Sequence, residues 1–307
     1  MNNNIYGLIG IGSINSNWNA DFDGSPKTDG NGNIKGSPYA LEYCIKNVWN
    51  LKGDRVLGIR EKDGKGQYYL KQSQKYTSVF GSELNKNTSN EEVLTNLLSC
   101  KDVLNFGCVF TGGKGEDNSI HLQGIVQIAD GLNKYNDTVI NTETILSPYA
   151  SGDKKTMTTN GVRVTTNEAH YLYPFTITPN QLDDRGRNIS YSNEDYEDFK
   201  DISLKAVTLY NSKTKVGCKN EFGLFVKVKE EYNYILALGD LSEYVSIYKD
   251  EEQLVYDLTK LNELLVDCKE KIESIEMYYK SNINKVVGLD VKELNVKQFD
   301  IITRKEL

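Results

Sequence analysis

The sequence of 307 residues lacks any apolar run close to the ~20 residues of a membrane-spanning helix, so we expect no membrane contact and a cytoplasmic location. Its five cysteines are widely spaced and form no Cys-x-x-Cys pair, which argues against zinc and disulfide frameworks. Only two histidines occur, and His121 has no second metal ligand nearby in the sequence. Dinucleotide and phosphate-loop motifs are also missing. We therefore predict no cofactor and no metal.

Positive charge is in short supply overall, because the net charge is −7. The acid surplus lies late in the chain: residues 1–111 carry twelve basic and eleven acidic residues, whereas residues 241–307 carry ten and fourteen. The net charge therefore argues against a whole-surface affinity for nucleic acid, but it does not exclude a basic groove. Twenty tyrosines fit interfaces, and they fit an AT-rich genome equally well.

The most unusual stretch is the polar segment 15–37, which lies between an apolar strand and an amphipathic helix. Loops longer than about 12–15 residues are mostly functional or disordered, and the aromatic residues Trp18 and Phe22 argue against disorder. Asp21 and Asp23 alternate and could share a magnesium ion or act in catalysis. They also begin a calcium-loop pattern, whose second half fails.

A third interpretation of the same segment is RNA binding. Trp18 would stack on a base, amide side chains would meet base edges, and Lys27 and Lys35 would meet phosphates. A solvated turn rich in Asn and Gly is the plain alternative for each of these residues.

Hydrophobic periodicity predicts strands at residues 5–14, 55–60, 103–110, 120–128, 171–177 and 221–229, with a late strand near 286–291. Helices are predicted from Ser37-Pro38 to Gly53, within 61–104, at 194–210 and in a long stretch over 251–279. The order β-α-β, β-α-β predicts an α+β fold of the RRM-like, ferredoxin type.

Residues 134–166 are polar and rich in Thr, and Asn160-Gly161 is a strong hairpin signal. Such an arm could carry Met157 as a wedge between bases, with Lys154 and Lys155 beside it. A flexible surface hairpin explains the same residues equally well.

Four features together resemble the backbone subunit of type I CRISPR interference complexes (Cascade), most closely the I-B branch. They are Asn15–Gly24 with Pro26, the helix opened by Gly36-Ser37, the strand Gly124-x-Val126-Gln127 before the Thr-rich arm, and the aromatic strand Tyr171–Phe175.

The resemblance implies an RRM-like palm (residues 1–60, 105–132 and 167–240), a helical finger (61–104), a thumb hairpin (133–166) and a C-terminal helical extension (241–307). It implies a ribonucleoprotein of antiviral defense in which several copies polymerise on one CRISPR RNA, together with other Cascade subunits, and present it to a target DNA strand. The RNA-binding residues would be Asn15, Asn17, Trp18, Asn19, Lys27, Lys35, Ser37, Lys46, Gln127, Lys154, Lys155, Met157 and Arg163.

The resemblance favours a scaffold without catalytic activity. The alternative is a metal-dependent endoribonuclease like the related type III backbone subunits, which would use Asp21 or Asp23. Both functions place the polar segment at the RNA.

Overall fold

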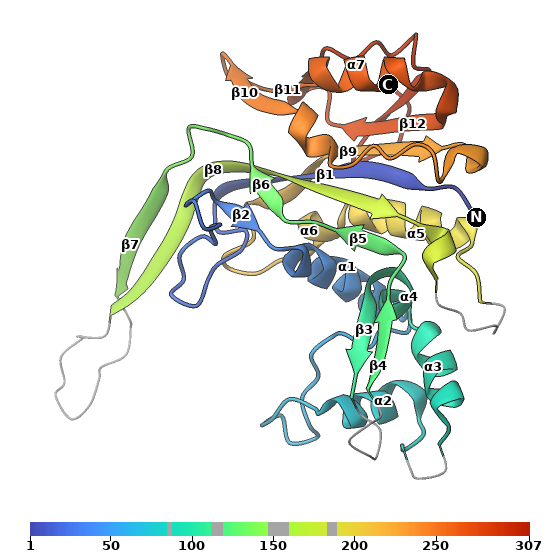
Figure 1. Cartoon of the computed structure of the whole chain (residues 1–307). Coiled ribbons are helices and arrows are strands. Elements are labelled where there is room, and N and C mark those ends of the chain that lie inside the picture. Colours follow the sequence, from blue (N-terminus) through green and yellow to red (C-terminus); the bar gives the residue numbers. More distant parts are fainter. Residues whose placement is uncertain (85–87, 112–118, 147–159, 183–188) are drawn as a thin grey trace.

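The computed structural model describes residues 1–84, 88–111, 119–146, 160–182 and 189–307. They form a mixed α+β structure with a large central sheet, a lobe below it and a projecting hairpin (Figure 1). The helices are α1 (Pro38–Lys52), α2 (Gln72–Phe80), α3 (Asn90–Leu98), α4 (Lys101–Phe106), α5 (Asn193–Ser203), α6 (Ala206–Leu209) and α7 (Thr259–Asp267). The strands are β1 (Ile5–Ser16), β2 (Lys35–Gly36), β3 (Gly107–Phe110), β4 (Ile120–Gln123), β5 (Val126–Ile128), β6 (Gly131–Asn133), β7 (Ile140–Leu146), β8 (Asn160–Ile177), β9 (Cys218–Val228), β10 (Ser246–Asp250), β11 (Gln253–Asp257), β12 (Ile272–Tyr279), β13 (Asn284–Val287) and β14 (Val296–Asp300).

The central sheet has nine strands in the order β14-β12-β9-β1-β8-β6-β2, with β5 and β7 also paired to β8. The predicted strands at 5–14, 171–177 and 221–229 are confirmed as its three middle strands. Both faces are covered, because Ile9 packs in the cluster with α1 and α5, whereas Leu8 packs in the cluster with α7. Burial on both faces explains why β1 is apolar at almost every position.

Helix α1 begins and ends where the sequence predicts. Pro38 occupies the first turn, and Gly53 ends the helix with a φ of +86°, a conformation that glycine adopts without steric cost. Its buried residues Leu41, Ile45 and Val48 repeat every three or four positions and face the sheet. Ser37 precedes the helix, but its side chain makes no capping hydrogen bond.

The lobe, which we call the helical lobe (residues 55–123), holds α2, α3, α4 and the hairpin β3–β4 around its own core. Two predictions were wrong here. Residues 55–60 are not a strand, because the N–H groups of Leu57 and Gly58 donate to the carboxylate of Asp102 (2.9 and 2.7 Å) instead of to a neighbouring strand. The range 105–132 of the implied palm is divided in the structure, because the hairpin β3–β4 lies outside the central sheet whereas β5 and the start of β6 belong to it.

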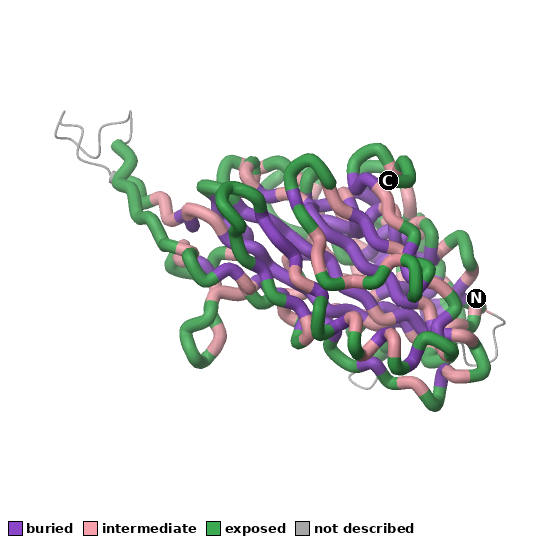
Figure 2. Tube along the Cα trace, turned by 90° about the horizontal axis from the view of Figure 1, so that it is seen from above, coloured by how far each residue is buried: buried purple, intermediate pink, exposed green. Residues whose placement is uncertain are grey.

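The hairpin arm consists of β7 and residues 160–166 of β8, and it projects from the body as a mostly exposed ribbon (Figures 1 and 2). An arm in this region was predicted, but its turn was misplaced. Asn160 and Gly161 pair with Leu146 and Ile145, so they belong to the ladder. Lys154, Lys155 and Met157 lie outside the described residues.

Residues 241–307 contain the five strands β10–β14 and a single α-helix, α7, so the predicted C-terminal helical extension is wrong. The supposed helix over 251–279 is β11, α7 and β12 in succession, and β12 and β14 extend the central sheet. The late strand near 286–291 is β13, which ends at Val287. None of the described helices has the length and apolar character needed to cross a membrane.

Candidate nucleic-acid interface

The end of β1 is the point where three other parts of the chain meet: the β1–α1 loop (residues 17–36), the start of α1 and the base of the hairpin arm. Oδ1 of Asn19 accepts a hydrogen bond from the N–H of Ser37 (2.8 Å), which ties the loop to the helix. The guanidinium of Arg163 donates to the carbonyl of Asn15 (3.3 Å), which ties the arm to the strand end. We call this region the junction.

Asn17 holds the junction together from inside. Its Nδ2 donates to the carbonyl of Gly24 (2.9 Å) and to that of Val164 on the arm (3.3 Å). Two polar atoms here, Oδ1 of Asn17 and Nε of Arg163, are buried without a partner among the described residues. Buried polar atoms are nearly always paired, so these two atoms can still take a hydrogen-bond partner from outside the described residues.

The β1–α1 loop is ordered by its own backbone. The N–H of Lys27 donates to the carbonyl of Asn19 and the N–H of Lys35 donates to that of Lys27, both at 2.8 Å. Short bridges at Ala20–Pro26 and Thr28–Ile34 complete two small turns. The loop therefore needs little further ordering to present its exposed side chains to a ligand.

Trp18 corrects the prediction of a stacking platform. Its side chain is 0% exposed, and its indole N–H donates to the hydroxyl of Tyr173 (2.6 Å). The ammonium of Lys215 lies 4.5 Å from the ring centroid and donates to the carbonyl of Trp18. A Cβ at Gly36 would approach the Tyr173 hydroxyl to 1.8 Å, so only glycine fits beside this pair. Trp18 anchors the loop in the core and cannot stack on a base.

The predicted cations differ in how free they are. Lys35 pairs with Asp130 (2.6 Å) and Lys46 with Glu42 (3.0 Å). Arg163 pairs with Glu143 at 3.6 Å, and Gln127 donates to the carbonyl of Gly124 at 2.8 Å, away from the junction on β5. Lys27 has no ion-pair partner among the residues that the structure describes, so it is the loop cation with a free charge.

Two exposed aromatic residues were not among the predicted RNA-binding residues. Phe22 is fully exposed in the turn of the loop, and Tyr39 is 76% exposed in the first turn of α1. The exposure of Tyr39 could have been predicted from the sequence. Tyr39 lies two positions before Leu41, the first buried residue of α1, and residues two positions apart do not share a face of a helix. These two aromatic side chains are available for stacking.

Asp21 and Asp23 cap turns of the loop. The Asp21 carboxylate accepts from the N–H of Phe22 (2.9 Å), and Asp23 accepts from the N–H and hydroxyl of Ser25 (2.9 and 3.1 Å). These bonds from Ser25 lower the pKa of Asp23 below its usual value. Within the described ranges, no three His, Cys, Asp or Glu side chains are grouped as a metal site would require. The geometry gives no specific support to metal-dependent cleavage.

Comparison with known proteins identifies the family of the chain. The family model "CRISPR-associated protein Cas7" matches residues 3–278. The chain belongs to the Cas7 family. Its structure is similar to a chain of a "CRISPR RNA-guided surveillance complex, pre-nicking", with 13% identity, a TM-score of 0.51 and 96% of both chains covered. A chain of another "CRISPR RNA-guided surveillance complex" gives 12% identity, a TM-score of 0.44 and coverage of 94% and 97%. No curated protein sequence matches.

Proposed function

We propose that this Cas7-family chain is the backbone subunit of a type I Cascade complex of the I-B branch, and that it binds CRISPR RNA at the junction. The observation that carries the proposal is the junction itself, where an ordered loop with the free cation Lys27, the exposed aromatic residues Phe22 and Tyr39, and the arm come together. A cation that contacts the phosphate backbone and aromatic side chains that stack on bases both bind RNA without reading its sequence. They suit a guide RNA whose sequence is read by base pairing.

The central sheet supports an RRM-like palm. In the order β9-β1-β8-β6 each strand is antiparallel to its neighbour, and α1 and α5 pack on the same face. The opposite face of the sheet is not exposed, because the C-terminal residues pack against it. RNA would therefore bind at the strand ends and not across the sheet. Further copies of the chain, other Cascade subunits and a target DNA strand complete the proposed assembly, and no catalytic step is assigned to the chain.

Salt dependence tests the phosphate contacts. With two unrelated single-stranded RNAs, Lys27→Ala should weaken the binding of both to the same degree and reduce the slope of log K against log salt by about 0.7, the value of one phosphate contact on a single strand. Lys260→Ala is the matched control, because Lys260 is exposed on α7 beyond the opposite face of the sheet. Wild-type protein that binds neither RNA at low salt would refute the proposed function.

Stacking is tested separately. Tyr39→Ala and Phe22→Ala should each weaken RNA binding by about 1–3 kcal/mol, the usual value of a base on an aromatic ring. Thermal stability should stay unchanged, because both side chains are exposed. Tyr234→Ala, at an 85% exposed tyrosine elsewhere, is the control. Equal losses in all three variants would contradict a stacking role.

Met157 remains a proposal from the sequence. It belongs to segment 147–159, which joins β7 to β8, and we propose that it wedges between bases. Met157→Asp should change the chemical-probe reactivity of guide bases at regular intervals without lowering the melting temperature of the free chain. An unchanged reactivity pattern would remove the wedge.

A further inference from the structure

The segment 55–75, which leads from α1 into α2, has a charge opposite to that of the whole chain. It carries six basic and two acidic residues, a surplus of four positive charges in a chain of net charge −7. A cluster of this kind on an acidic protein is the usual mark of a polyanion-binding surface. The segment lies on the helical lobe, apart from the junction (Figure 1).

The two acidic residues of the segment do not neutralise its surface. Glu61 is held by Lys75 (2.7 Å) and by the hydroxyl of Ser78. Asp63 caps a turn and accepts from the N–H of Gln67 (2.8 Å). Lys75 neutralises Glu61, whereas Asp63 keeps its charge, so the surface of the segment still carries more positive than negative charge.

Other cations of the segment are exposed and unpaired. Arg60, Lys62, Lys65 and Lys71 are all exposed, and none of them forms an ion pair with a carboxylate in the described part of the chain. At the junction, by contrast, Lys35 and Arg163 are paired with acids, and Lys27 is the free cation. Free, long side chains are costly to order and are strongly screened by salt, so they suit a strand that binds weakly and reversibly.

Two tyrosines stand among these cations. Tyr68 is 73% exposed and Tyr69 is 60% exposed. The Arg60 guanidinium lies 5.8 Å from the centroid of the Tyr69 ring, and a bridge between Lys62 and Tyr69 fixes the turn. Cations that alternate with exposed aromatic side chains bind single strands, whose unstacked bases can lie on the rings.

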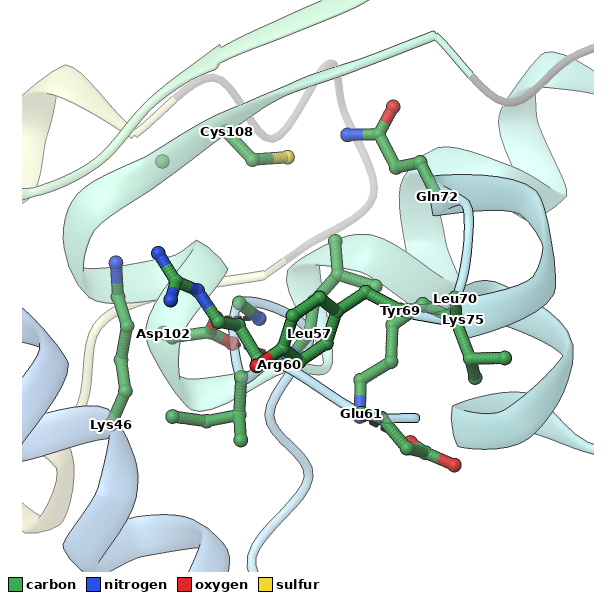
Figure 3. A pocket seen from close by; sticks show the side chains of 13 residues that line it. Lys46, Leu57, Arg60, Glu61, Tyr69, Leu70, Gln72, Lys75, Asp102 and Cys108 are labelled. Atoms are coloured by element: carbon green, nitrogen blue, oxygen red, sulfur yellow. Dashed lines mark hydrogen bonds and ion pairs between the residues drawn. The ribbon is translucent and has the colours of Figure 1, made fainter. Parts of the chain in front are cut away.

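A cavity of about 420 Å³ opens beside Tyr69, between the lobe and α1 (Figure 3). Apolar side chains such as Leu57 and Leu70 form part of its wall, and Lys46, Arg60 and Gln72 bring polar groups to it. An apolar cavity of a few hundred Å³ with a few convergent polar groups is typical of small-ligand sites, and a nucleobase with its sugar is of that size.

We propose that this surface binds a single strand of nucleic acid other than the guide RNA, with phosphates on the Lys62–Lys71 turn and one unstacked base in the cavity beside Tyr69. The site is separate from the proposed guide site at the junction. Its free cations predict an affinity that is independent of sequence and sensitive to salt.

The test uses the chain of residues 1–307, both loaded with guide RNA and free of it. Fluorescein-labelled oligo-dT, which has no complementarity to the guide, is added and its anisotropy is measured over a series of salt concentrations. The variant K62A/K65A/K71A should reduce the slope of log K against log salt by about two, at roughly 0.7 per phosphate contact for single strands. Y68A/Y69A should weaken binding about tenfold or more. A DNA duplex of the same length should compete poorly.

The variant K260A/K292A/K297A removes three exposed lysines of the C-terminal part and is the matched control. Equal loss of affinity in this control would overturn the proposal, as would effective competition by the duplex. A lysine variant that reduces self-association but not oligo-dT binding would identify a contact with another copy instead, and would also overturn it. Loss of guide loading in the lobe variants would place the surface on the guide path. A wild-type chain that binds oligo-dT but loads no guide would instead refute the function proposed above.

Discussion

Trp18→Ala should lower the free energy of unfolding by about 3–5 kcal/mol, the usual cost of truncating a buried tryptophan. The indole is fully buried, and it loses its hydrogen bond to Tyr173 (2.6 Å) together with an edge-to-face ring contact at 6.5 Å. The substitution also removes the cation–π contact between the ammonium of Lys215 and the indole ring. Urea denaturation followed by far-ultraviolet circular dichroism measures the effect, since Trp49 is the only tryptophan left for fluorescence.

Phe22→Ala is the matched control, because Phe22 lies in the same loop and is fully exposed. Its free energy of unfolding should stay within about 0.5 kcal/mol of the wild type. The two variants therefore separate anchoring from stacking. If Trp18→Ala keeps its stability but loses RNA affinity, Trp18 contacts RNA and does not anchor the loop.

The sequence predicted the elements whose signals are local. The strand at 5–14 is apolar at almost every position, the strand at 221–229 contains the apolar run Phe222–Val226, and α1 is marked by Pro38 and Gly53. The burial of Trp18 could not be predicted from the sequence, because its partner Tyr173 is 155 positions away and only the folded sheet brings the two together. A polar loop gives no sign of which aromatic side chain points inward.

The prediction of a long helix in the C-terminal part was wrong for a different reason. Leu254, Val255 and Tyr256 form a short continuous apolar run, which cannot be assigned to a helix or a strand by periodicity alone. In the structure, β11 pairs with β10 and β13, and the turn before α7 is fixed by Asp257, which accepts from the N–H of Thr259 (3.0 Å). Residues 253–257 form a strand because β10 and β13 pair with them, and the local sequence pattern does not show this pairing.

Glu221→Gln should give the other large effect, and one that depends on pH. Glu221 on β9 is buried, and its Oε1 lies 2.6 Å from Nδ1 of His170 and accepts from the hydroxyl of Tyr256 (2.7 Å). The other ring nitrogen of His170 lies 2.9 Å from Glu168. A Cβ at Gly12 would come within 2.2 Å of Glu221 Oε2, which explains a glycine at this point of β1.

Both ring nitrogens of His170 face carboxylate oxygens, so the charged imidazolium is the form that donates to both. Burial lowers the pKa of His170, but the carboxylates of Glu221 and Glu168 raise it more, and the net pKa lies above the usual 6.5. A raised folded-state pKa stabilises the folded chain fully at pH values below about 6.5, and this stabilisation is lost as the pH rises through the folded pKa.

Glu221→Gln should therefore cost about 3 kcal/mol of unfolding free energy at pH values below 6.5, because it leaves a buried charge with one partner fewer. The difference from the wild type should narrow as the pH rises and His170 becomes neutral in both chains. Urea denaturation at several pH values on both sides of 6.5 measures it. Glu293→Gln, which breaks the exposed Lys269–Glu293 pair (2.7 Å), should change stability little at any pH. A Glu221→Gln cost that stays constant across the pH range would mean that Glu221 acts through packing and hydrogen bonding alone, and that His170 carries no charge in the folded chain.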